Sequence, residues 1–477
     1  MSANRRSIGI VSHKKVHLAL WPCLILQGAH SFSVVTSVHL NQISSLSLAR
    51  PNQLHHPGRF PPLFSIDSTN GPLHEIDSDR SRRIVVVGKI IIDNYGDPSK
   101  RAKKDSAPSA LTVGGGGPQA AWGAAAALAV RSHFFRSESV QTSKGSNRPI
   151  TSLPPRQPVT FIAPIGLQNW TPQHAAALEN LLIPVIDVPP VLISSVDHIT
   201  PTINIWHDEN ETVQWYPVDG SFDARGADGL WRNRPSATDI LATLKNDVPN
   251  SLSESDSIVL HCIVESGENP TGKGEDALFL HDLELLSKIT VLGIEPIVFP
   301  DGDTQRVSQE NGKSVASLIE NVQQSLAAQN NPDHTLLVVT PDRACFDSAF
   351  AKDGTDNNNT WLTQSWISTE IVVRNGAHGS FIKDQQEFPS ATLQTPNKKP
   401  LNPTGAGNAY SAAYVACRGT GSTSKEAAVL ATAVGAVVCE YEHLPGWSWE
   451  VLERVAEAAR EVERKLSDEM SRFSSKL

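Results

Sequence analysis

The feature that most constrains this chain is the stretch at residues 402–408, Asn-Pro-Thr-Gly-Ala-Gly-Asn, which leads directly into a run of small residues at 409–416. The small residues predict a helix that packs closely against its neighbours, and the two glycines predict a tight turn where that helix begins. The free backbone N–H groups and the dipole of a helix N-terminus favour bound anions. The stretch therefore predicts a phosphate site at the start of a buried helix.

This stretch resembles the second signature of the ribokinase-like (PfkB) carbohydrate kinases, D-T-x-G-A-G-D. In that family the glycines form an anion hole for the transferred phosphoryl group, and the final Asp is the general base. The resemblance implies a nucleotide contact for Thr404 and catalytic positions at Gly405, Ala406, Gly407 and Asn408. Asn408 carries an amide where the base is expected, and a positioned base contributes about 10²–10⁴ in rate. An enzyme with Asn408 at this position could therefore be slow without being inactive.

Composition sets broad limits. A chain of 477 residues allows one large α/β domain with tails, and no apolar run reaches the ~20 residues that span a bilayer. The net charge of −9 argues against a general affinity for nucleic acids or anionic membranes. The five cysteines are odd in number and widely spaced, so we expect buried free thiols and neither a disulfide framework nor a zinc site.

The first 66 residues contain no Asp or Glu and are rich in Ser and basic residues, which is typical of targeting peptides. Lys14 and Lys15 precede an apolar segment at 16–26, as in a signal peptide, and the Ser-rich segment at 33–65 resembles a transit peptide. Together they resemble the bipartite plastid presequence of algae with secondary plastids. We expect a leader and linker over residues 1–81; a disordered tail, a mitochondrial presequence or a cytoplasmic protein are the alternatives.

The β-branched run at 84–87, followed by Gly88, predicts a buried first strand. The segment from Val87 to Asp93 resembles the V-G-x-x-x-x-D that opens these kinases, whose Asp binds sugar hydroxyls. A carboxylate suits that task because it accepts two hydroxyl hydrogen bonds. An Asp at a strand end is otherwise a common turn residue.

Four glycines at 114–117 precede Gln119 and an Ala-rich helix. They resemble the first signature, G-G-x-G-x-N, in which glycines let the sugar approach the backbone and the Asn contacts a hydroxyl. The resemblance implies substrate contacts from Gly115, Gly116 and Gln119, with Gln119 as a longer amide. A flexible linker is the alternative, which the helix that begins at once disfavours.

The middle of the chain contains an expected insertion at 131–158 and a predicted β-hairpin at 199–216. By resemblance the hairpin forms a lid over the sugar and can also clasp a second copy, so a monomer and a homodimer both stay open. The strand at 257–265 ends in Glu265, which resembles a second sugar contact. His261 and His281 are expected to be core or surface residues.

The segments expected to bind the nucleotide differ most from the pattern of the kinase family. The family carries N-x-x-E after a late strand, whose Glu organises magnesium and phosphates, whereas here Asp342 remains and Cys345 replaces the Glu. Asp342 is the one metal-site candidate. The segment with Arg374, Gly376 and Gly379 resembles the strand and loop that precede the nucleotide site in the family. Arg374 is expected either to pair with phosphate or to be solvated.

The alternation of strands and helices predicts a ribokinase-like three-layer α/β/α sandwich over residues 82–466, with a mainly parallel sheet, a small β lid near 199–216 and a tail at 467–477. Closing helices are expected at 424–440 and 449–466, the second with a solvated charged face. By resemblance the protein is an ATP- and Mg²⁺-dependent kinase for a sugar or small polyol, without a membrane or nucleic-acid partner. The alternative is an inactive PfkB-like protein that binds or scaffolds in an organelle, for example in plastid transcription machinery.

Overall fold

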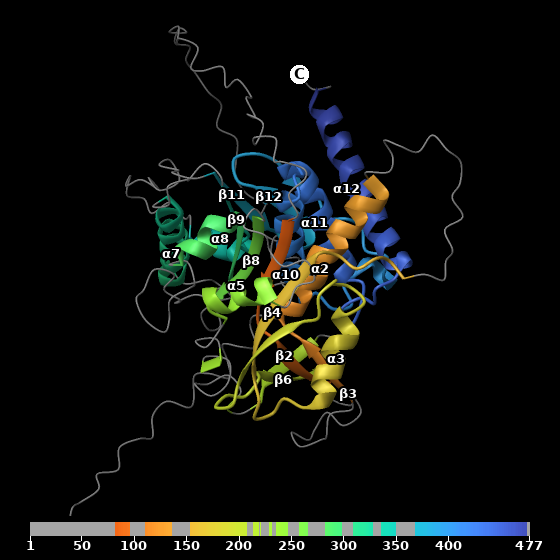
Figure 1. The fold of residues 1–477 in the computed structure, drawn as a ribbon. Coiled ribbons are helices and arrows are strands. Elements are labelled where there is room, and N and C mark those ends of the chain that lie inside the picture. Colours follow the sequence, from red (N-terminus) through yellow and green to blue (C-terminus); the bar gives the residue numbers. More distant parts are fainter. Residues whose placement is uncertain are drawn as a thin grey trace, which may run out of the picture.

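The structure is a computed structural model, and the residues it describes are 82–95, 110–135, 153–207, 213–218, 220, 229–230, 235–246, 257–265, 282–297, 309–327, 335–349 and 368–474. The predicted leader at 1–81, most of the insertion at 131–158 and His281 lie outside them. The described parts form a large sheet covered by helices, with a smaller sheet at one end (Figure 1).

The large sheet has the strand order β13-β12-β11-β10-β9-β8-β1-β4-β5 within the described residues. Strands β5 to β11 in this order pair in parallel, and β12 and β13 add antiparallel edge strands. Their bounds are β1 (Arg82–Val87), β4 (Val159–Gly166), β5 (Val191–Ser195), β8 (Ser257–Glu265), β9 (Ile289–Ile297), β10 (Leu336–Val339), β11 (Thr369–Arg374), β12 (Ser380–Ile382) and β13 (Glu387–Phe388).

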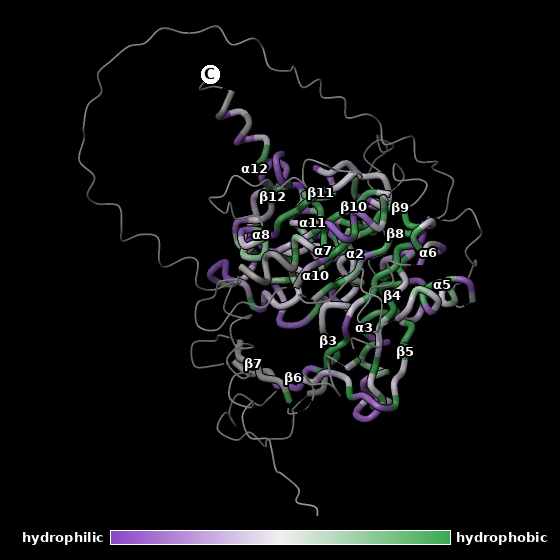
Figure 2. Tube along the Cα trace, turned by 90° about the vertical axis from the view of Figure 1, so that its left-hand side faces the viewer, coloured by the Kyte–Doolittle hydropathy of each residue, from purple (hydrophilic) through white to green (hydrophobic). Residues whose placement is uncertain are grey.

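Helices cover both faces of this sheet, which explains why its strands are continuous apolar runs. One face carries α2 (Gly116–Val130), α3 (Pro172–Leu182), α10 (Ala406–Gly419), α11 (Ser424–Val438) and α12 (Trp449–Ser474). The other carries α5 (Ala237–Asn246), α6 (Leu283–Lys288), α7 (Gln309–Ala327) and α8 (Arg343–Ala349). The apolar interior of the sheet is visible in Figure 2. The predicted three-layer α/β/α arrangement is confirmed.

The smaller sheet is the lid, defined as β2 (Ile91–Tyr95), β3 (Ala110–Gly114), β6 (Thr202–His207) and β7 (Val213–Pro217). Its order is β3-β2-β6-β7, and β6 and β7 pair antiparallel as the predicted hairpin. Asp93 lies within β2 instead of in a turn after the first strand. The lid therefore contains more of the chain than the hairpin alone.

The two helices that follow the glycine-rich stretches, α2 and α10, are in backbone contact. A Cβ atom on Gly123 of α2 would overlap the backbone of Ala409, so only glycine fits at this crossing. On its other side α10 rests on the sheet, because a Cβ on Gly293 of β9 would overlap the side chain of Val415. The small residues of α10 thus permit the close packing that the sequence predicted.

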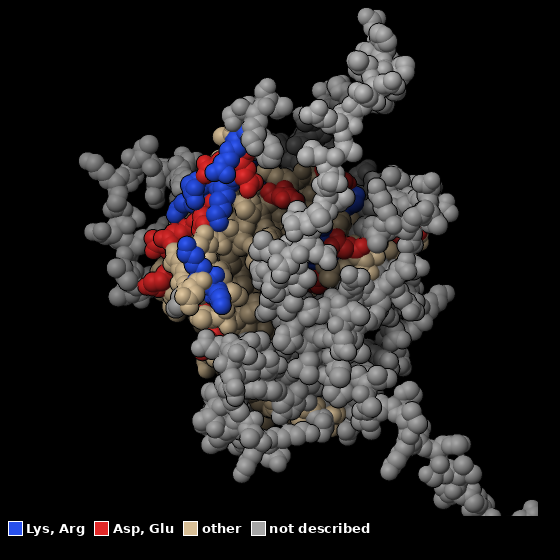
Figure 3. Space-filling model, turned by 180° about the vertical axis from the view of Figure 1, so that it is seen from behind, with Lys and Arg blue, Asp and Glu red and all other residues tan. Residues whose placement is uncertain are grey.

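The last helix is longer than expected. α12 continues to Ser474, eight residues beyond the expected end of the closing helix at 466. Its exposed side carries mixed charges, including the i,i+4 pair of Arg464 and Asp468, and basic and acidic side chains lie intermixed on this side of the molecule in Figure 3. None of the described helices has the length and apolar character needed to cross a bilayer.

Candidate active site

The predicted turn before α10 is present. Gly405 adopts φ +88° in the left-handed region, where glycine is strongly favoured, and the helix begins at Ala406. Asn402 fixes the approach to the turn: its Oδ1 accepts from the Thr404 N–H at 2.9 Å and its Nδ2 donates to the Glu442 carbonyl at 2.8 Å. The turn thus presents the N-terminus of a buried 14-residue helix, a suitable place for an anion.

The two glycine-rich stretches meet through their amides. Asn408 Nδ2 donates a hydrogen bond of 2.8 Å to Oε1 of Gln119, which lies in the first turn of α2. A Cβ on Gly405 would overlap the Gln119 side chain, so this amide lies directly over the turn. The structure therefore brings together the two positions that the sequence assigned to base and substrate contact.

Asp93 lies beside the same glycine stretch. A Cβ on Gly114 would overlap its Oδ2, and a Cβ on Gly116 would be 3.2 Å from Asn408 Nδ2. Burial raises the pKa of Asp93 to about 7, because an apolar environment disfavours the charged carboxylate. Gly115, at φ +93°, makes the turn between β3 and α2. Asp93, Gly115, Gly116, Gln119 and Asn408 thus lie close together around the first glycine-rich turn.

A buried ion pair lies on the other side of the turn. Arg374, at the end of β11, donates from Nη1 to Oε1 of Glu295 at 2.7 Å, and a Cβ on Gly407 would overlap that Nη1. His261 Nε2 lies 3.5 Å from the other oxygen of Glu295. Burial alone would raise the pKa of Glu295, but the Arg374 guanidinium and the His261 imidazole hold it below its ordinary value.

Glu295 was not predicted from the sequence, whereas His261 was expected to be a core or surface residue and is a core residue. Both are fully buried, at 0% exposure, and they lie on the adjacent strands β9 and β8. A Glu within an apolar strand is rarely buried unless it is paired, so Glu295 was itself an indication of a partner. Its partner Arg374 is distant in the sequence and could not be identified from spacing.

Asp342, the predicted metal ligand, caps a helix in the structure. Asp342 Oδ1 accepts from the backbone N–H of Cys345 at 2.7 Å, which makes Asp342 a cap for α8. Burial raises the pKa of the Cys345 thiol, and a neutral thiol is a poor ligand for a hard cation. Within the described ranges no group of three or more His, Cys, Asp or Glu side chains could hold a metal. Within the described residues, the predicted ligand Asp342 is thus engaged as a helix cap, and Cys345 is unsuited to Mg²⁺.

The remaining predicted nucleotide residues have structural explanations. Gly376, at φ +55°, and Gly379, at φ +88°, make the turn between β11 and β12, and a Cβ on Gly379 would overlap the Phe388 carbonyl. Thr404 lies in the turn that Asn402 fixes. Glu265 ends β8, and its side chain lies outside the described part of the chain.

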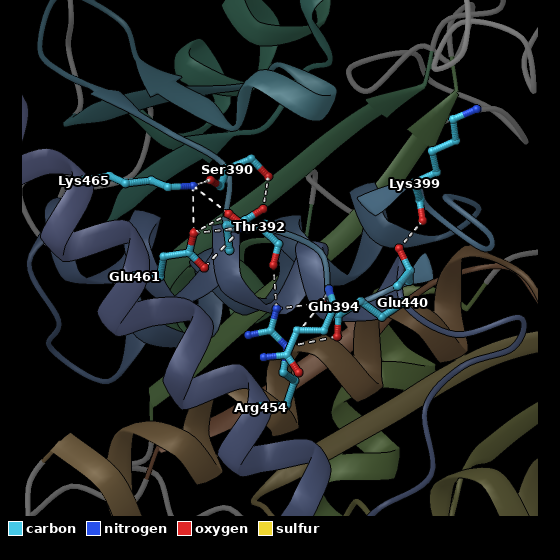
Figure 4. Close-up of polar contacts among 10 residues, drawn as sticks. Ser390, Thr392, Gln394, Lys399, Glu440, Arg454, Glu461 and Lys465 are labelled. Carbon is cyan, nitrogen blue, oxygen red and sulfur yellow. Dashed lines mark hydrogen bonds and ion pairs between the residues drawn. The ribbon is translucent and has the colours of Figure 1, made fainter. Parts of the chain in front are cut away.

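A polar cluster fixes the segment at 390–394 against α12 (Figure 4). Arg454 donates to Glu440 at 2.6 Å and to the Thr392 carbonyl at 2.8 Å, and the Gln394 N–H donates to Glu440 at 2.8 Å. Glu461 accepts from the Thr392 hydroxyl at 2.5 Å and pairs with Lys465 at 2.9 Å. The expectation that Lys465 and Glu461 only form a solvated face is therefore wrong, because both hold this segment in place.

Comparison with known proteins supports the resemblance for part of the chain. Residues 349–445 match the family model described as pfkB family carbohydrate kinase. No curated protein sequence matches the chain.

Several solved structures are similar. A nucleoside kinase of Methanocaldococcus jannaschii is 17% identical, with a TM-score of 0.43 over 79% of this chain and 99% of its own. A Thermotoga maritima ribokinase is 14% identical, with a TM-score of 0.41 over 79% and 99%. An Arabidopsis thaliana ribokinase complexed with ribose and ATP is 12% identical, with a TM-score of 0.40 over 78% and 98%.

Proposed function

For a ribokinase-like chain whose residues 349–445 match the pfkB family carbohydrate kinases, we propose slow transfer of a phosphoryl group from ATP to a hydroxyl of a sugar or related polyol. The observation that carries the proposal is the Gln119–Asn408 hydrogen bond, which joins the two glycine-rich turns, together with Asp93, which packs against Gly114 of the first turn. A buried carboxylate for hydroxyls and a helix N-terminus for a phosphoryl group are the two parts that such a transfer needs.

Each residue has a distinct task in this proposal. Asp93 accepts hydrogen bonds from the hydroxyls of the acceptor, for which it must be ionised. The N-terminus of α10 stabilises the negative charge of the transferring group. Asn408 orients the attacking hydroxyl through a hydrogen bond but takes no proton from it, because an amide has no useful basicity. The reaction is therefore slow, as positioning and charge stabilisation act without a base.

A second function is favoured by one specific observation. The Gln119 side chain lies over Gly405 and already bonds to Asn408, so the two amides are satisfied by each other. Because the site also lacks a general base, this arrangement supports a protein that binds a polyol or nucleotide and does not turn it over. Such a protein would act through binding or scaffolding.

The two functions are separated by binding and turnover measured on the full chain. We would incubate the protein with ATP and a panel of sugars, polyols and nucleosides, and detect the phosphorylated product by mass spectrometry. Calorimetry with the same panel measures binding. A phosphorylated product that Asp93→Asn fails to form supports the kinase. Binding of one compound without any product supports the second function, and no binding of any compound contradicts both.

For the leader, we propose import into a plastid, which rests on the absence of acidic residues before Asp67. N-terminal sequencing of the native protein should find a start between about residues 32 and 82, given where a leader of this kind ends. A native protein that begins at Met1 in the cytosol would contradict this proposal.

A further inference from the structure

Building on the proposed nucleotide site, we propose that Arg374 provides the positive charge for the phosphate groups, so that the protein binds polyphosphate without a divalent metal. The proposal concerns the turn at Gly405 and Gly407 and the side chain that packs against it. The proposal goes beyond a phosphate contact at Arg374, because it predicts that polyphosphate binding persists when Mg²⁺ is removed.

The guanidinium is placed at the turn by its surroundings. Its Nη1 lies where a Cβ on Gly407 would be, and Glu295 holds that nitrogen at 2.7 Å. Because Glu295 is fully buried on β9, the guanidinium is fixed from the side of the sheet. An arginine held in this way loses little freedom when it binds an anion.

The guanidinium of Arg374 also has a hydrogen-bond donor without a partner among the described residues. Arg374 Nε is buried and has no hydrogen-bond partner among the described residues. The Nε atom is buried, whereas the side chain as a whole keeps 14% exposure. Buried donors without partners are uncommon and are explained when a ligand satisfies them. A planar guanidinium with free donors is well matched to phosphate.

Two carboxylates near the turn, Asp342 and Glu295, each have one oxygen engaged by the protein. Asp342 caps α8 through the Cys345 N–H, and Glu295 is bound by Arg374. A protein-bound Mg²⁺ usually needs one or two free carboxylates in addition to the substrate phosphates. The described residues at this turn therefore offer a fixed cation, and each of these two carboxylates is already engaged by a protein partner.

The alternative is that Arg374 blocks the phosphate site, and this alternative predicts the opposite effect of removing Arg374 on nucleotide binding. If the guanidinium fills the anion site and excludes phosphate, then removal of Arg374 should strengthen nucleotide binding. If it binds phosphate, then the same removal should weaken binding. The sign of one measured change distinguishes the two.

The first experiment is calorimetric titration of the full chain with ATP and with inorganic tripolyphosphate, in EDTA and in Mg²⁺. We expect both ligands to bind in EDTA, with a Kd within about threefold of the value in Mg²⁺, since the charge-assisted hydrogen bonds come from the protein. Binding of ATP in Mg²⁺ alone overturns the inference and leaves the proposed kinase standing. Failure to bind either ligand in EDTA overturns it whatever the turnover assay gives.

The second experiment uses variants that keep the shape of the buried pair. Glu295→Gln leaves the cation with a neutral neighbour and should bind tripolyphosphate at least as tightly as the wild type. The double variant Glu295→Gln, Arg374→Gln should bind about tenfold more weakly or worse, since one charge-assisted hydrogen bond is lost. The matched control is Glu370→Gln, Arg418→Gln, which alters a similar buried pair with a 2.7 Å contact near the C-terminal end of α10.

The control should leave polyphosphate binding unchanged, and thermal melts verify that each variant is folded. Unchanged or tighter binding by the Arg374 double variant overturns the inference. If that variant does not fold, the comparison of EDTA and Mg²⁺ in the wild type still decides the matter.

Discussion

Asn408 Nδ2 and Gln119 Oε1 lie 2.8 Å apart and join the helix that begins after one glycine-rich turn to the helix that begins after the other. In this arrangement Asn408 donates from its amide nitrogen and Gln119 accepts through its amide oxygen. Asn408 therefore directs its donor, and not its acceptor oxygen, at Gln119. The acceptor oxygen is the atom that remains to receive a hydrogen bond from a substrate hydroxyl.

Asn408→Asp should raise sugar phosphorylation at least about tenfold, a conservative share of what a positioned base contributes. Gln119 can turn its amide and donate to the new carboxylate, and the helix N-terminus favours the added negative charge. ATP affinity should hardly change, because the base acts on the acceptor hydroxyl. A coupled assay of ADP formation over the sugar panel is the measurement.

Asn402→Asp is the control for that change, because Asn402 bonds to the Glu442 carbonyl and the Thr404 N–H outside the amide pair. It should give no gain in rate. Equal inactivity of the wild type and Asn408→Asp on every sugar, with ATP still bound, would mean that the missing base is not the limiting defect.

Asp93→Asn should change how stability depends on pH. Burial raises the pKa of Asp93 from 3.8 to about 7, so between these values the folded chain holds a proton that the unfolded chain has released. The free energy of unfolding therefore falls as the pH rises through this window, and Asp93→Asn should remove that fall. Above pH 7 the variant should be more stable than the wild type. Urea unfolding from pH 4 to pH 8 measures the effect.

The same variant should bind sugar more weakly at pH 8, where the wild-type carboxylate is ionised, and should bind ATP normally. Equal losses for both ligands would show that Asp93 supports the fold instead of the substrate. A slope of stability with pH that is the same in both proteins would contradict the raised pKa.

Gly405→Ala should destabilise the protein more than Gly421→Ala. Both glycines have φ in the left-handed region, at +88° and +85°, so each alanine carries a strain of about 1–2 kcal/mol. The new Cβ at Gly405 would also overlap Gln119, whereas at Gly421 nothing lies within 4 Å. Chemical denaturation of both variants gives the comparison. Equal losses would mean that Gln119 moves aside freely.

Arg454→Ala should lower the free energy of unfolding by about 3–5 kcal/mol, since it leaves Glu440 buried and without its charged partner. The exposed pair of Arg464 and Asp468, with Arg464 at 64% exposure, provides the control. Arg464→Ala should cost about 0.5 kcal/mol or less. Similar losses in the two variants would show that the cluster at 390–394 does not depend on Arg454.

The sequence was sufficient to predict the elements that depend on local pattern. The β-branched run at 84–87 is the end of β1, and the small residues after Gly407 form the helix α10 because close packing requires them. The two glycine turns were identified because a left-handed φ restricts the choice of residue. These features have short-range causes.

The site was predictable only in outline. Glu295 and Arg374 meet because β9 and β11 flank β10 in the sheet, a fact of topology that no local pattern contains. Asp342 has the residue type of a metal ligand, but the three-residue spacing to Cys345 equally suits a helix cap, which the structure shows. Side-chain partners across the fold depend on the register of distant strands, and this was beyond the sequence argument.

The contact of Gly123 with Ala409 has a mechanical consequence. Because the backbones of α2 and α10 pack directly against each other at Gly123, Gln119 and Asn408 are held together by close helix packing as well as by their hydrogen bond. Asp93 belongs to the lid instead, so any swing of that sheet about its connections moves Asp93 relative to a stationary amide pair. Under the proposed function, a movement of the lid would change the distance between an acceptor held by Asp93 and the turn at Gly405, whereas the amide pair would keep its orientation.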